Sequence, residues 1–223
     1  MREIVIDTET TGLDPRNGDR IVEIAAVELV NHLPTGRVFH HYLNPDREMS
    51  EDAFAVHGLT TGFLADKPRF AEIAQSFTQF IDGARLVIHN AEFDLAFLNA
   101  ELGRVSQAGL GRDRAVDTLA LARQKFPGAQ ASLDALCRRF AIDNSARTKH
   151  GALLDAELLS EVYLELIGGR QAGFDLAAAP GMLEVAIEAV RRFRPPRPHA
   201  PDVAELAAHA ALVARLKEPL WLT

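Results

Sequence analysis

The sequence predicts an α/β domain, a mixed sheet flanked by helices over about residues 1–168, followed by a linker and a short C-terminal segment. Two observations support this fold class. Three strand-like segments open the chain, and two of them are close enough to form a hairpin. Helical and strand patterns then alternate, which is typical of helices packed on a sheet that contains parallel strands.

The first strand is expected over residues 2–7, where the apolar run REIVID is short and would be buried. Two further strands are expected over residues 20–31 and 36–44. The residues LPTG at 33–36 are the expected turn between them, because Pro and Gly interrupt regular structure. Residues 84–90 are expected to form another buried strand.

Helices are expected where apolar residues recur every three or four positions between a capping residue and a glycine. One begins after Ser50, a favourable N-cap, and ends at Gly58. Another has apolar side chains at 70, 73, 77, 80 and 81 and stops before Gly83. The expected helices cover residues 50–58, 68–83, 91–104, 131–142 and 150–169, and residues 114–126 are expected to be a short strand running into a helix.

The composition of the sequence changes after the last of these helices. Residues 169–201 are expected to be a linker, with a short helix at 182–193 and an irregular Pro-rich stretch at 194–201. Residues 202–223 show a helical pattern with Asp202 as N-cap and end in the apolar PLWLT. One short helix cannot bury its own apolar face, so this segment is expected to dock on its own domain or on another protein.

The composition is that of a soluble globular protein, with 48% apolar and 25% charged residues. No apolar stretch approaches the roughly 18 to 20 residues of a membrane helix, and the N-terminus lacks a signal-peptide pattern. The single cysteine, Cys137, cannot form an internal disulfide and is expected to be a buried, reduced thiol. We therefore expect a cytoplasmic protein with no membrane association.

The net charge of −7 is unevenly distributed. Residues 191–223 contain six Lys/Arg and three Asp/Glu. Residues 1–190 therefore contain 18 Lys/Arg and 28 Asp/Glu and carry a net charge of −10. An acidic body does not bind nucleic acid strongly by counterion release. A nuclease of this composition would need metal ions to offset its carboxylates, or a partner protein to hold it on its substrate.

Two carboxylates stand at the end of the first strand, in IVIDTETTGLD. Side chains at i and i+2 of a strand point the same way, so Asp7 and Glu9 lie side by side. Two negative charges at such a short distance repel each other unless a cation lies between them. Oxygen ligands of this kind favour the hard cations Mg²⁺ and Mn²⁺. The same pattern is also common at a solvated strand end.

Two more acidic groups follow at helix starts. Asp94 lies in the first turn of the helix after a buried strand, where its only role could be a favourable interaction with the helix dipole. His150 stands at the entrance of a later helix that contains Asp155. His150 could be an exposed loop histidine and Asp155 part of a polar helix face. However, leucines flank Asp155, and an acid near an apolar face requires a partner.

Taken together, the four carboxylates and one histidine indicate hydrolysis of a phosphodiester. Four carboxylates can hold two divalent ions about 3.5–4 Å apart, the arrangement for in-line attack. A histidine with an ordinary pKa near 6.5 can accept a proton from the attacking water at neutral pH.

With these residues, the sequence resembles the DEDDh family of 3′→5′ exonucleases, which have an RNase H-like fold. The resemblance covers about residues 1–168 and rests on IDTETTG (6–12), HNAEFD (89–94) and HGALLDA (150–156). It implies a metal-dependent exodeoxyribonuclease with two divalent ions, Mg²⁺ or Mn²⁺. The implied roles are metal binding by Asp7, Glu9 and Asp155, completion of the metal shell by Asp94, and general base catalysis by His150.

The resemblance also implies the residues that contact the terminal nucleotide. The metal-binding Asp7, Glu9 and Asp155 would touch it, and AFAVHGLT (53–60) resembles the segment that lines the family's nucleotide pocket. His57 is the implied contact in this segment, with Asp52 just before it as a looser match. His57 could also be an ordinary histidine at a helix end.

The length and the tail narrow the resemblance to the proofreading (epsilon) subunits of bacterial DNA polymerase III. That resemblance implies removal of mispaired nucleotides from single-stranded 3′ DNA ends during replication, with release of nucleoside 5′-monophosphates. It implies that residues 202–223 bind the polymerase alpha subunit, and Trp221 is the kind of aromatic anchor that carries interface energy. Gln171, Phe174 and Leu176 are spaced as in a sliding-clamp-binding peptide, although they could equally be linker residues.

Two other functions remain possible at this point. A relative of the same superfamily could degrade RNA or short oligonucleotides without a polymerase, although such an enzyme would not need 50 residues after the last motif. A non-catalytic interaction module could carry these acids for structural reasons, but the complete set of four acids and a histidine argues against it.

Overall fold

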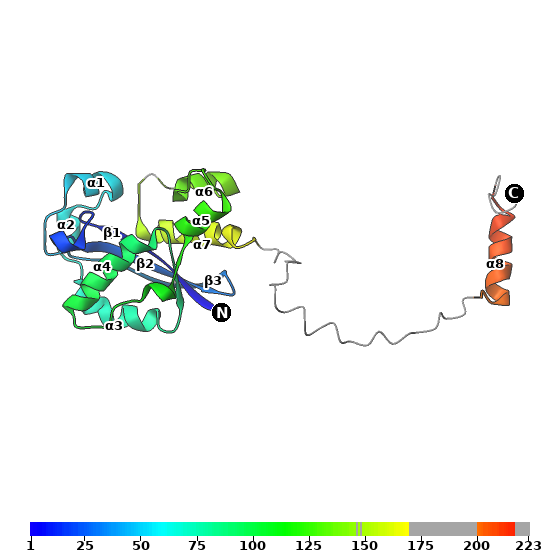
Figure 1. Ribbon diagram of the computed structural model, residues 1–223, viewed down its shortest axis with the longest axis horizontal. Helices are drawn as coiled ribbons and strands as arrows, with labels where there is room; N and C mark the ends of the chain where they lie inside the picture. Colours follow the sequence, from blue (N-terminus) through cyan, green and yellow to red (C-terminus); the bar gives the residue numbers. More distant parts are fainter. Residues whose placement is uncertain (146, 148, 170–199, 217–223) are drawn as a thin grey trace. The chain divides into compact units, whose positions relative to one another are not determined.

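The computed structural model describes residues 1–145, 147, 149–169 and 200–216. The chain divides into two compact units, Met1–Gly173 and Phe174–Thr223. The first unit contains the sheet and the helices around it, and the second contains one described helix (Figure 1).

A five-stranded mixed sheet lies at the centre of the first unit, in the order β3-β2-β1-β4-β5. The first three strands are antiparallel neighbours, whereas β4 and β5 run parallel to β1. The strands are β1 (Arg2–Thr10), β2 (Ile21–Val30), β3 (Leu33–Tyr42), β4 (Arg85–Ile88) and β5 (Ala115–Asp117). The predicted fold class, a mixed sheet flanked by helices, is confirmed.

The first strand is longer than predicted. We expected it to end at Asp7, but its pairing with β2 continues to Thr10, which lies opposite Ile21. Glu9 is therefore inside the strand, opposite Glu23 of β2. Backbone pairing on one side is enough to extend a strand past the last apolar residue, and this holds both carboxylates on a rigid element.

The predicted turn at residues 33–36 is wrong. The chain reverses two residues earlier, at Asn31 and His32, which have positive φ angles of 52° and 67°. Leu33 already pairs with Val30. Two consecutive left-handed residues make the tight turn that matches the twist of a hairpin, and asparagine tolerates this conformation well. Pro34 and Gly36 instead lie in the exposed first half of the edge strand β3.

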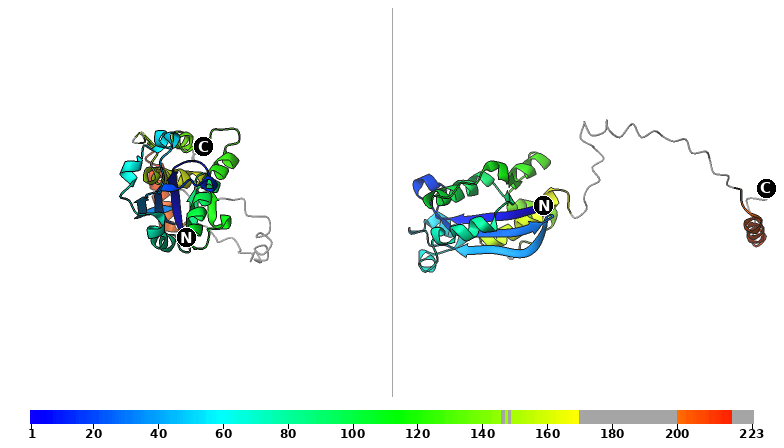
Figure 2. Two further views of the ribbon diagram at one scale, coloured as in Figure 1. Left: turned by 90° about the vertical axis from the view of Figure 1, so that its left-hand side faces the viewer. Right: turned by 90° about the horizontal axis from the view of Figure 1, so that it is seen from below.

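Alternating side chains along the strands supply both faces of the sheet. In β1, Ile4 and Ile6 face one hydrophobic cluster, and Val5 between them faces the other. All three are fully buried. Helices cover both faces (Figures 1 and 2): α3 (Phe70–Phe80) and α4 (Ala91–Arg104) on the first, and α5 (Thr118–Lys125), α6 (Leu133–Phe140) and α7 (Ala152–Leu166) on the second.

Helix α1 (Glu51–His57) has the caps that the sequence predicts. The hydroxyl of Ser50 accepts a hydrogen bond from the backbone N–H of Ala53. Gly58 ends the helix with a φ of 74°, a left-handed conformation that favours glycine. The backbone N–H of Gly58 bonds back to the carbonyl of Phe54, so the end of α1 is fixed in place.

The other helices agree with the prediction in number and place. The bounds of α4 are those expected, and residues 114–126 form a short strand followed by a helix. The predicted helices at 68–83, 131–142 and 150–169 are each shorter at both ends. Three short elements were not predicted, namely α2 (Thr61–Leu64) and 3-10 helices at Pro15–Asn17 and Arg112–Arg114. Each is one turn long, too short to show a periodic pattern.

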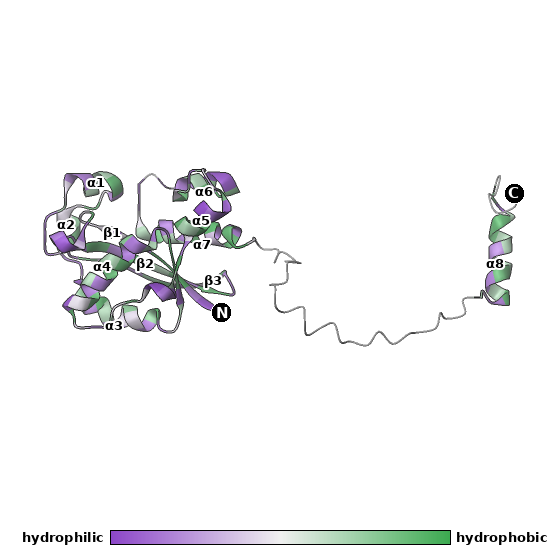
Figure 3. Ribbon diagram, in the orientation of Figure 1, coloured by the Kyte–Doolittle hydropathy of each residue, from purple (hydrophilic) through white to green (hydrophobic). Residues whose placement is uncertain are grey.

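The described part of the second unit is α8 (Val203–Val213). Asp202 caps it as predicted, and Glu205 completes a capping box. Hydrophobic and hydrophilic segments alternate along α8 in Figure 3, and Val203, Leu206 and Leu212 are exposed. The predicted helix at 182–193, the clamp-binding residues Gln171–Leu176 and the terminal PLWLT lie outside the described residues.

Two simpler predictions concern burial and membranes. Cys137 is fully buried and unpaired, as expected. Burial raises the pKa of its thiol, which makes the reactive thiolate scarce. Among the described helices, none has the length and apolar character needed to cross a membrane.

Candidate active site

Three separate elements bring the predicted acidic residues together. Asp7 and Glu9 stand in the second half of β1, at the centre of the sheet. Asp94 follows the parallel strand β4, in the first turn of α4. Asp155 lies in the first turn of α7, which packs across β1 and β2. Because β1 and β4 are parallel neighbours, their carboxyl ends meet at one edge of the sheet.

A cavity of about 750 Å³ opens at this edge. All five residues predicted for metal binding and catalysis line it: Asp7, Glu9, Asp94, His150 and Asp155. Residues 129–134 around the start of α6 also line it, as do Thr8, His89, Phe93, Leu119, Arg123 and Arg147. The three sequence motifs therefore meet in one space, although the first residue, Asp7, and the last, Asp155, are 148 positions apart in the chain.

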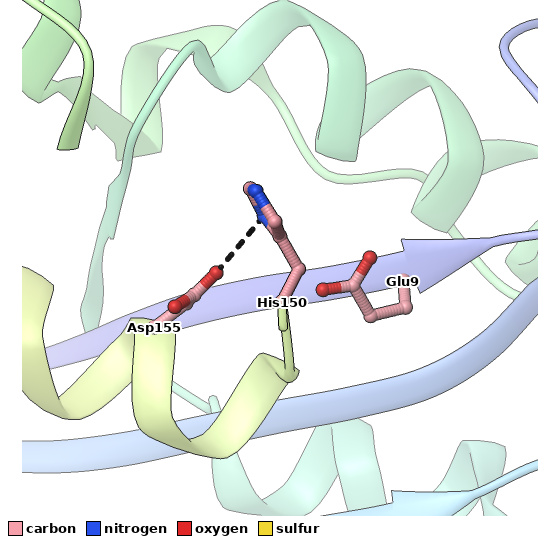
Figure 4. Close-up of side chains that lie close together, drawn as sticks. All are labelled: Glu9, His150 and Asp155. Carbon is pink, nitrogen blue, oxygen red and sulfur yellow. Dashed lines mark ion pairs between the residues drawn. The ribbon is translucent and has the colours of Figure 1, made fainter. Parts of the chain in front are cut away.

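Glu9, His150 and Asp155 come closest together. One ligand atom from each lies within 4.8 Å of the other two. Figure 4 shows Glu9 on strand β1, Asp155 on the first turn of α7 and His150 just before that helix, with the three side chains around one space. The imidazole Nδ1 of His150 lies 3.3 Å from Oδ2 of Asp155. Glu9 and Asp155 are buried, whereas the side chain of His150 is 49% exposed and open to a substrate.

Burial raises the pKa values of three of these carboxylates, and the other acids of the set add repulsion at Asp7 and Glu9. Desolvation raises the pKa of Glu9 to about 8, with Asp155 and Glu23 adding repulsion. Desolvation raises the pKa of Asp94 to about 7 despite the hydrogen bond from Thr8. The pKa of Asp7 is raised well above its usual value, first by desolvation and then by repulsion from its acidic neighbours. Each of these groups would be more easily ionised if a cation were added.

Asp155 behaves differently from the other three. Burial by itself would raise its pKa, but contacts from His150 and Arg147 outweigh burial and hold the pKa below its usual value. Of the four predicted metal-binding carboxylates, Asp155 is therefore the one most firmly ionised. Its charge balances that of the guanidinium beside it.

The donor set fits a divalent metal ion. Four carboxylates and a histidine line one cavity, and oxygen ligands suit Mg²⁺ or Mn²⁺ better than soft metals. Burial raises the pKa values of Glu9 and Asp94, and a bound cation would favour their ionised forms. The described residues that line this cavity include no cysteine, which a softer metal would favour.

A hydroxyl fixes the orientation of Asp94. Thr8 stands between Asp7 and Glu9 in β1, and its Oγ1 donates a hydrogen bond of 2.7 Å to Oδ1 of Asp94. Both side chains are buried. This bond joins α4 to β1. Sequence inspection gave Thr8 no role, because a threonine in a strand is ordinary.

The residues predicted to contact a nucleotide line a second cavity of about 570 Å³. His57 and Asp52 of α1 line it, together with Thr10 and Leu13. Glu9, Thr8 and Phe93 line both cavities, so the two spaces adjoin at the carboxylates. One nucleotide could occupy the second cavity with its phosphate at Glu9.

His57 is held rigidly at the wall of the second cavity. Its Nδ1 accepts a hydrogen bond of 3.0 Å from the backbone N–H of Leu59, so its Nε2 carries the proton when the ring is neutral. The Nε2 lies 3.3 Å from the carbonyl oxygen of Thr10. Burial lowers the pKa of His57, which favours the neutral ring. Asp52 is exposed and lies one turn earlier in α1.

Sequence reasoning missed Arg147. Its guanidinium contacts both Asp155 and Asp134, and its side chain is only 7% exposed. The available signal was an arginine three residues before His150, in an otherwise acidic set of motifs. Phe93 was also missed, because its position in both cavities follows from the turn between β4 and α4.

Solved exonuclease structures share this fold. Exonuclease X in complex with 5′ overhanging duplex DNA aligns with a TM-score of 0.56 and 28% identity, over 74% of this chain and 90% of that one. The nuclease domain of 3'hExo, a DEDDh family member bound to rAMP, aligns with a TM-score of 0.64 over 74% of this chain and 91% of that one. Its identity is 18%, so it shows the fold alone.

Relatives of known name are closer in sequence. The DNA polymerase III subunit epsilon of Rickettsia felis is 56% identical over 179 residues, which cover 79% of this chain and 78% of that protein. The subunit of the same name from Escherichia coli K12 is 51% identical over 181 residues, which cover 76% of this chain and 72% of that protein.

Residues 4–163 match the Exonuclease (RNase_T) family, which spans the sheet and all three motifs. The predicted family is therefore confirmed by sequence as well as by fold. This chain belongs to the exonuclease family, together with the proteins named DNA polymerase III subunit epsilon.

Proposed function

We propose that this chain is the proofreading 3′→5′ exonuclease of a bacterial DNA polymerase III, acting during DNA replication. One observation carries the proposal: four carboxylates and a histidine from three distant motifs line a single cavity, which adjoins a second cavity of nucleotide size. The high identity to relatives named DNA polymerase III subunit epsilon supports the polymerase assignment. The product is a nucleoside 5′-monophosphate.

Two divalent ions, Mg²⁺ or Mn²⁺, are proposed to bind to Asp7, Glu9, Asp94 and Asp155. When bound, they would neutralise the scissile phosphate, lower the pKa of the attacking water and stabilise the leaving 3′ oxygen. The support for this is the oxygen donor set and the raised pKa values of Asp7, Glu9 and Asp94, which are caused first by desolvation and then by nearby acidic groups.

His150 is the proposed general base. Its side chain is half-exposed beside Glu9 and Asp155, where an attacking water would lie next to the scissile phosphate. As the water oxygen bonds to phosphorus, the imidazole accepts its proton and the bond to the 3′ oxygen breaks. Asp155, which is firmly ionised, stabilises the imidazolium that forms.

The second cavity is the proposed site of the terminal nucleotide. His57 and Asp52 line it, and Leu13 and Val56 supply apolar surface for a base. Asp7, Glu9 and Asp155 would contact the same nucleotide through its phosphate. The cavity has room for an unpaired end, and a mispaired end frays at a lower free-energy cost than a paired one. Preference for errors would follow from this difference.

The partners are proposed from the ends of the sequence. Residues 1–168 would form the exonuclease domain, residues 169–201 a linker and residues 202–223 the segment that binds the polymerase alpha subunit. The exposed apolar side chains of α8 support a partner for this segment. Gln171–Leu176 would contact the sliding clamp, a proposal that rests on sequence alone. A tether compensates for weak DNA binding by the acidic body, and the complex would act in the cytoplasm.

The first test is digestion of DNA and RNA of one sequence, each labelled at the 5′ end. We expect Mg²⁺-dependent laddering from the 3′ end of single-stranded DNA, faster than on RNA, and none with EDTA. Gel electrophoresis of time points measures both rates. Faster loss of RNA would agree with the proposed active site but contradict the proofreading role. Absence of cleavage of both substrates would contradict the proposed exonuclease activity.

Substitutions in the cavity test the catalytic roles. Asp7→Ala should abolish cleavage with the fold intact, because a metal ligand is lost. His150→Ala should lower kcat by about 10²–10⁴, the usual contribution of a general base. Asp66→Ala is the matched control, since Asp66 is an exposed acid paired with Lys67 and should have no effect. Wild-type activity of His150→Ala would rule out the proposed base.

The carboxylate pKa values predict how stability depends on pH. The pKa of Glu9 is about 8 when folded against an ordinary 4.5, so between about pH 5 and pH 8 the folded chain holds a proton that the unfolded chain has lost. The metal-free protein should therefore become less stable as pH rises through this window, and Asp94 acts in the same direction. Asp155 has a lowered pKa, so its contribution to stability changes only at pH values below this window.

Thermal unfolding at several pH values, with EDTA or with Mn²⁺, measures this effect. Mn²⁺ should weaken or reverse the trend, because it stabilises the ionised carboxylates. Glu9→Gln, which cannot titrate, should flatten the slope in EDTA. Stability that rises with pH in EDTA would show that these carboxylates are not raised as described.

Truncation tests the tail. A chain that ends after Gly169 retains the whole sheet and both cavities, so it should digest single-stranded DNA at a rate close to that of the full chain. It should fail to co-purify with the polymerase alpha subunit. Retained binding would contradict the role proposed for residues 202–223.

A further inference from the structure

Arg147 is a nearly buried cation inside the acidic cavity. Its Nη2 donates a hydrogen bond of 2.6 Å to Oδ2 of Asp155, and its Nε donates to the other oxygen of the same carboxylate. Its Nη1 donates a third bond, of 2.6 Å, to Oδ1 of Asp134 at the start of α6. The side chain is 7% exposed. Such a two-pronged pair is among the strongest contacts that arginine makes.

This contact uses the atoms that a metal ion would need. Both oxygens of Asp155 accept from the guanidinium, and Asp155 is a proposed metal ligand. The guanidinium occupies one acceptor site on each oxygen, and its positive charge beside the carboxylate disfavours a divalent cation at the same oxygens. The guanidinium and the metal ion are therefore alternative partners of Asp155.

Arg147 also engages the proposed general base. Its Nη2 lies 2.9 Å from Nδ1 of His150. A guanidinium only donates hydrogen bonds, so in the neutral tautomer that has no proton on Nδ1 this nitrogen accepts from Arg147 and its lone pair is occupied. The ring cannot use that nitrogen to take a proton from water while the contact lasts. One side chain thus holds both Asp155 and His150 in a non-reactive arrangement.

Electrostatics explains why the fold tolerates this arrangement. Asp7, Glu9, Asp94 and Asp155 line one cavity, and without a cation only protonation would relieve the repulsion between charged groups. Arg147 supplies positive charge to this set. Its bond to Asp134, which is not a proposed metal ligand, ties the side chain to α6 independently of Asp155.

We infer that Arg147 is a positioning residue that takes the place of the divalent cation in the metal-free site and yields Asp155 and His150 when metal binds. This inference rests on the metal site of the proposed function. Arg147 would then stabilise the metal-free enzyme while it holds the proposed base, His150. Metal binding would release His150 from this contact.

Thermodynamic linkage gives the inference a measurable consequence. If Arg147 and the metal ion compete for Asp155, loss of Arg147 destabilises the metal-free protein more than the metal-bound one. The increase in unfolding temperature on adding Mn²⁺ must then be larger in the variant. Affinity for Mn²⁺ must rise as well, because no guanidinium has to be displaced.

The experiment compares full-length wild type with Arg147→Met and Arg147→Lys in thermal unfolding, with EDTA and with Mn²⁺, and in calorimetric titration with Mn²⁺. Arg147→Met should unfold about 6 °C or more below wild type in EDTA, since breaking a buried pair is costly, and the difference should shrink in Mn²⁺. It should bind Mn²⁺ about tenfold more tightly or better, the scale of a hydrogen bond to a charged group.

Arg20→Met is the matched control. Arg20 makes the same two-pronged contact with a buried carboxylate, Glu101, at 2.6 and 2.9 Å, but neither lines the acidic cavity. It should lower the unfolding temperature equally with EDTA and with Mn²⁺. Arg147→Lys keeps a charge without the fork and should show the same changes in smaller measure, so it serves if Arg147→Met does not fold.

Two results would overturn the inference. If Mn²⁺ stabilises wild type and both Arg147 variants equally, or binds the variants more weakly, Arg147 does not compete with the metal, while the proposed metal site stands. If Mn²⁺ neither binds nor stabilises wild type, the metal site fails and the inference fails with it.

Discussion

Repulsion among buried carboxylates is the constraint on which this site depends. Four acids from three motifs line one cavity, and three of them have raised pKa values because they are desolvated and close together. Such a cluster opposes folding unless a rigid core holds it and a cation balances it. The sheet supplies the rigidity, since β1 is buried between two layers of helices and paired on both sides.

The order of the strands determines where substrate can bind. The antiparallel pairing of β1 with β2 extends the strand past Glu9, and the parallel pairing with β4 delivers Asp94 to the same edge. Helix α1, with caps at both ends, forms the wall of the neighbouring cavity. The two cavities share Glu9 and Phe93, so a nucleotide and its phosphate would be held by different elements that meet at one strand.

Positive charge in the cavity links stability to activity. Arg147 balances Asp155 from a position next to His150. Glu9 and Asp94 have raised pKa values, and neither forms an ion pair with another of the described residues. A divalent cation would complete the balance and is also what the chemistry requires. The body of the protein has a net charge of −10 over residues 1–190, so its hold on DNA would come from the metal site and from a partner rather than from a basic surface.

The sequence by itself determined the fold class, most helices and the five residues of the candidate site, because hydrophobic periodicity, caps and motif spacing are local signals. It did not determine the reversal at Asn31 and His32 or the extension of β1 to Thr10, since both depend on pairing with β2. Only the tertiary structure decided that Thr8 orients Asp94 and that Arg147 engages Asp155. Contacts between residues on different elements leave no periodic trace in a single sequence, and their energy depends on a cavity that exists only after folding.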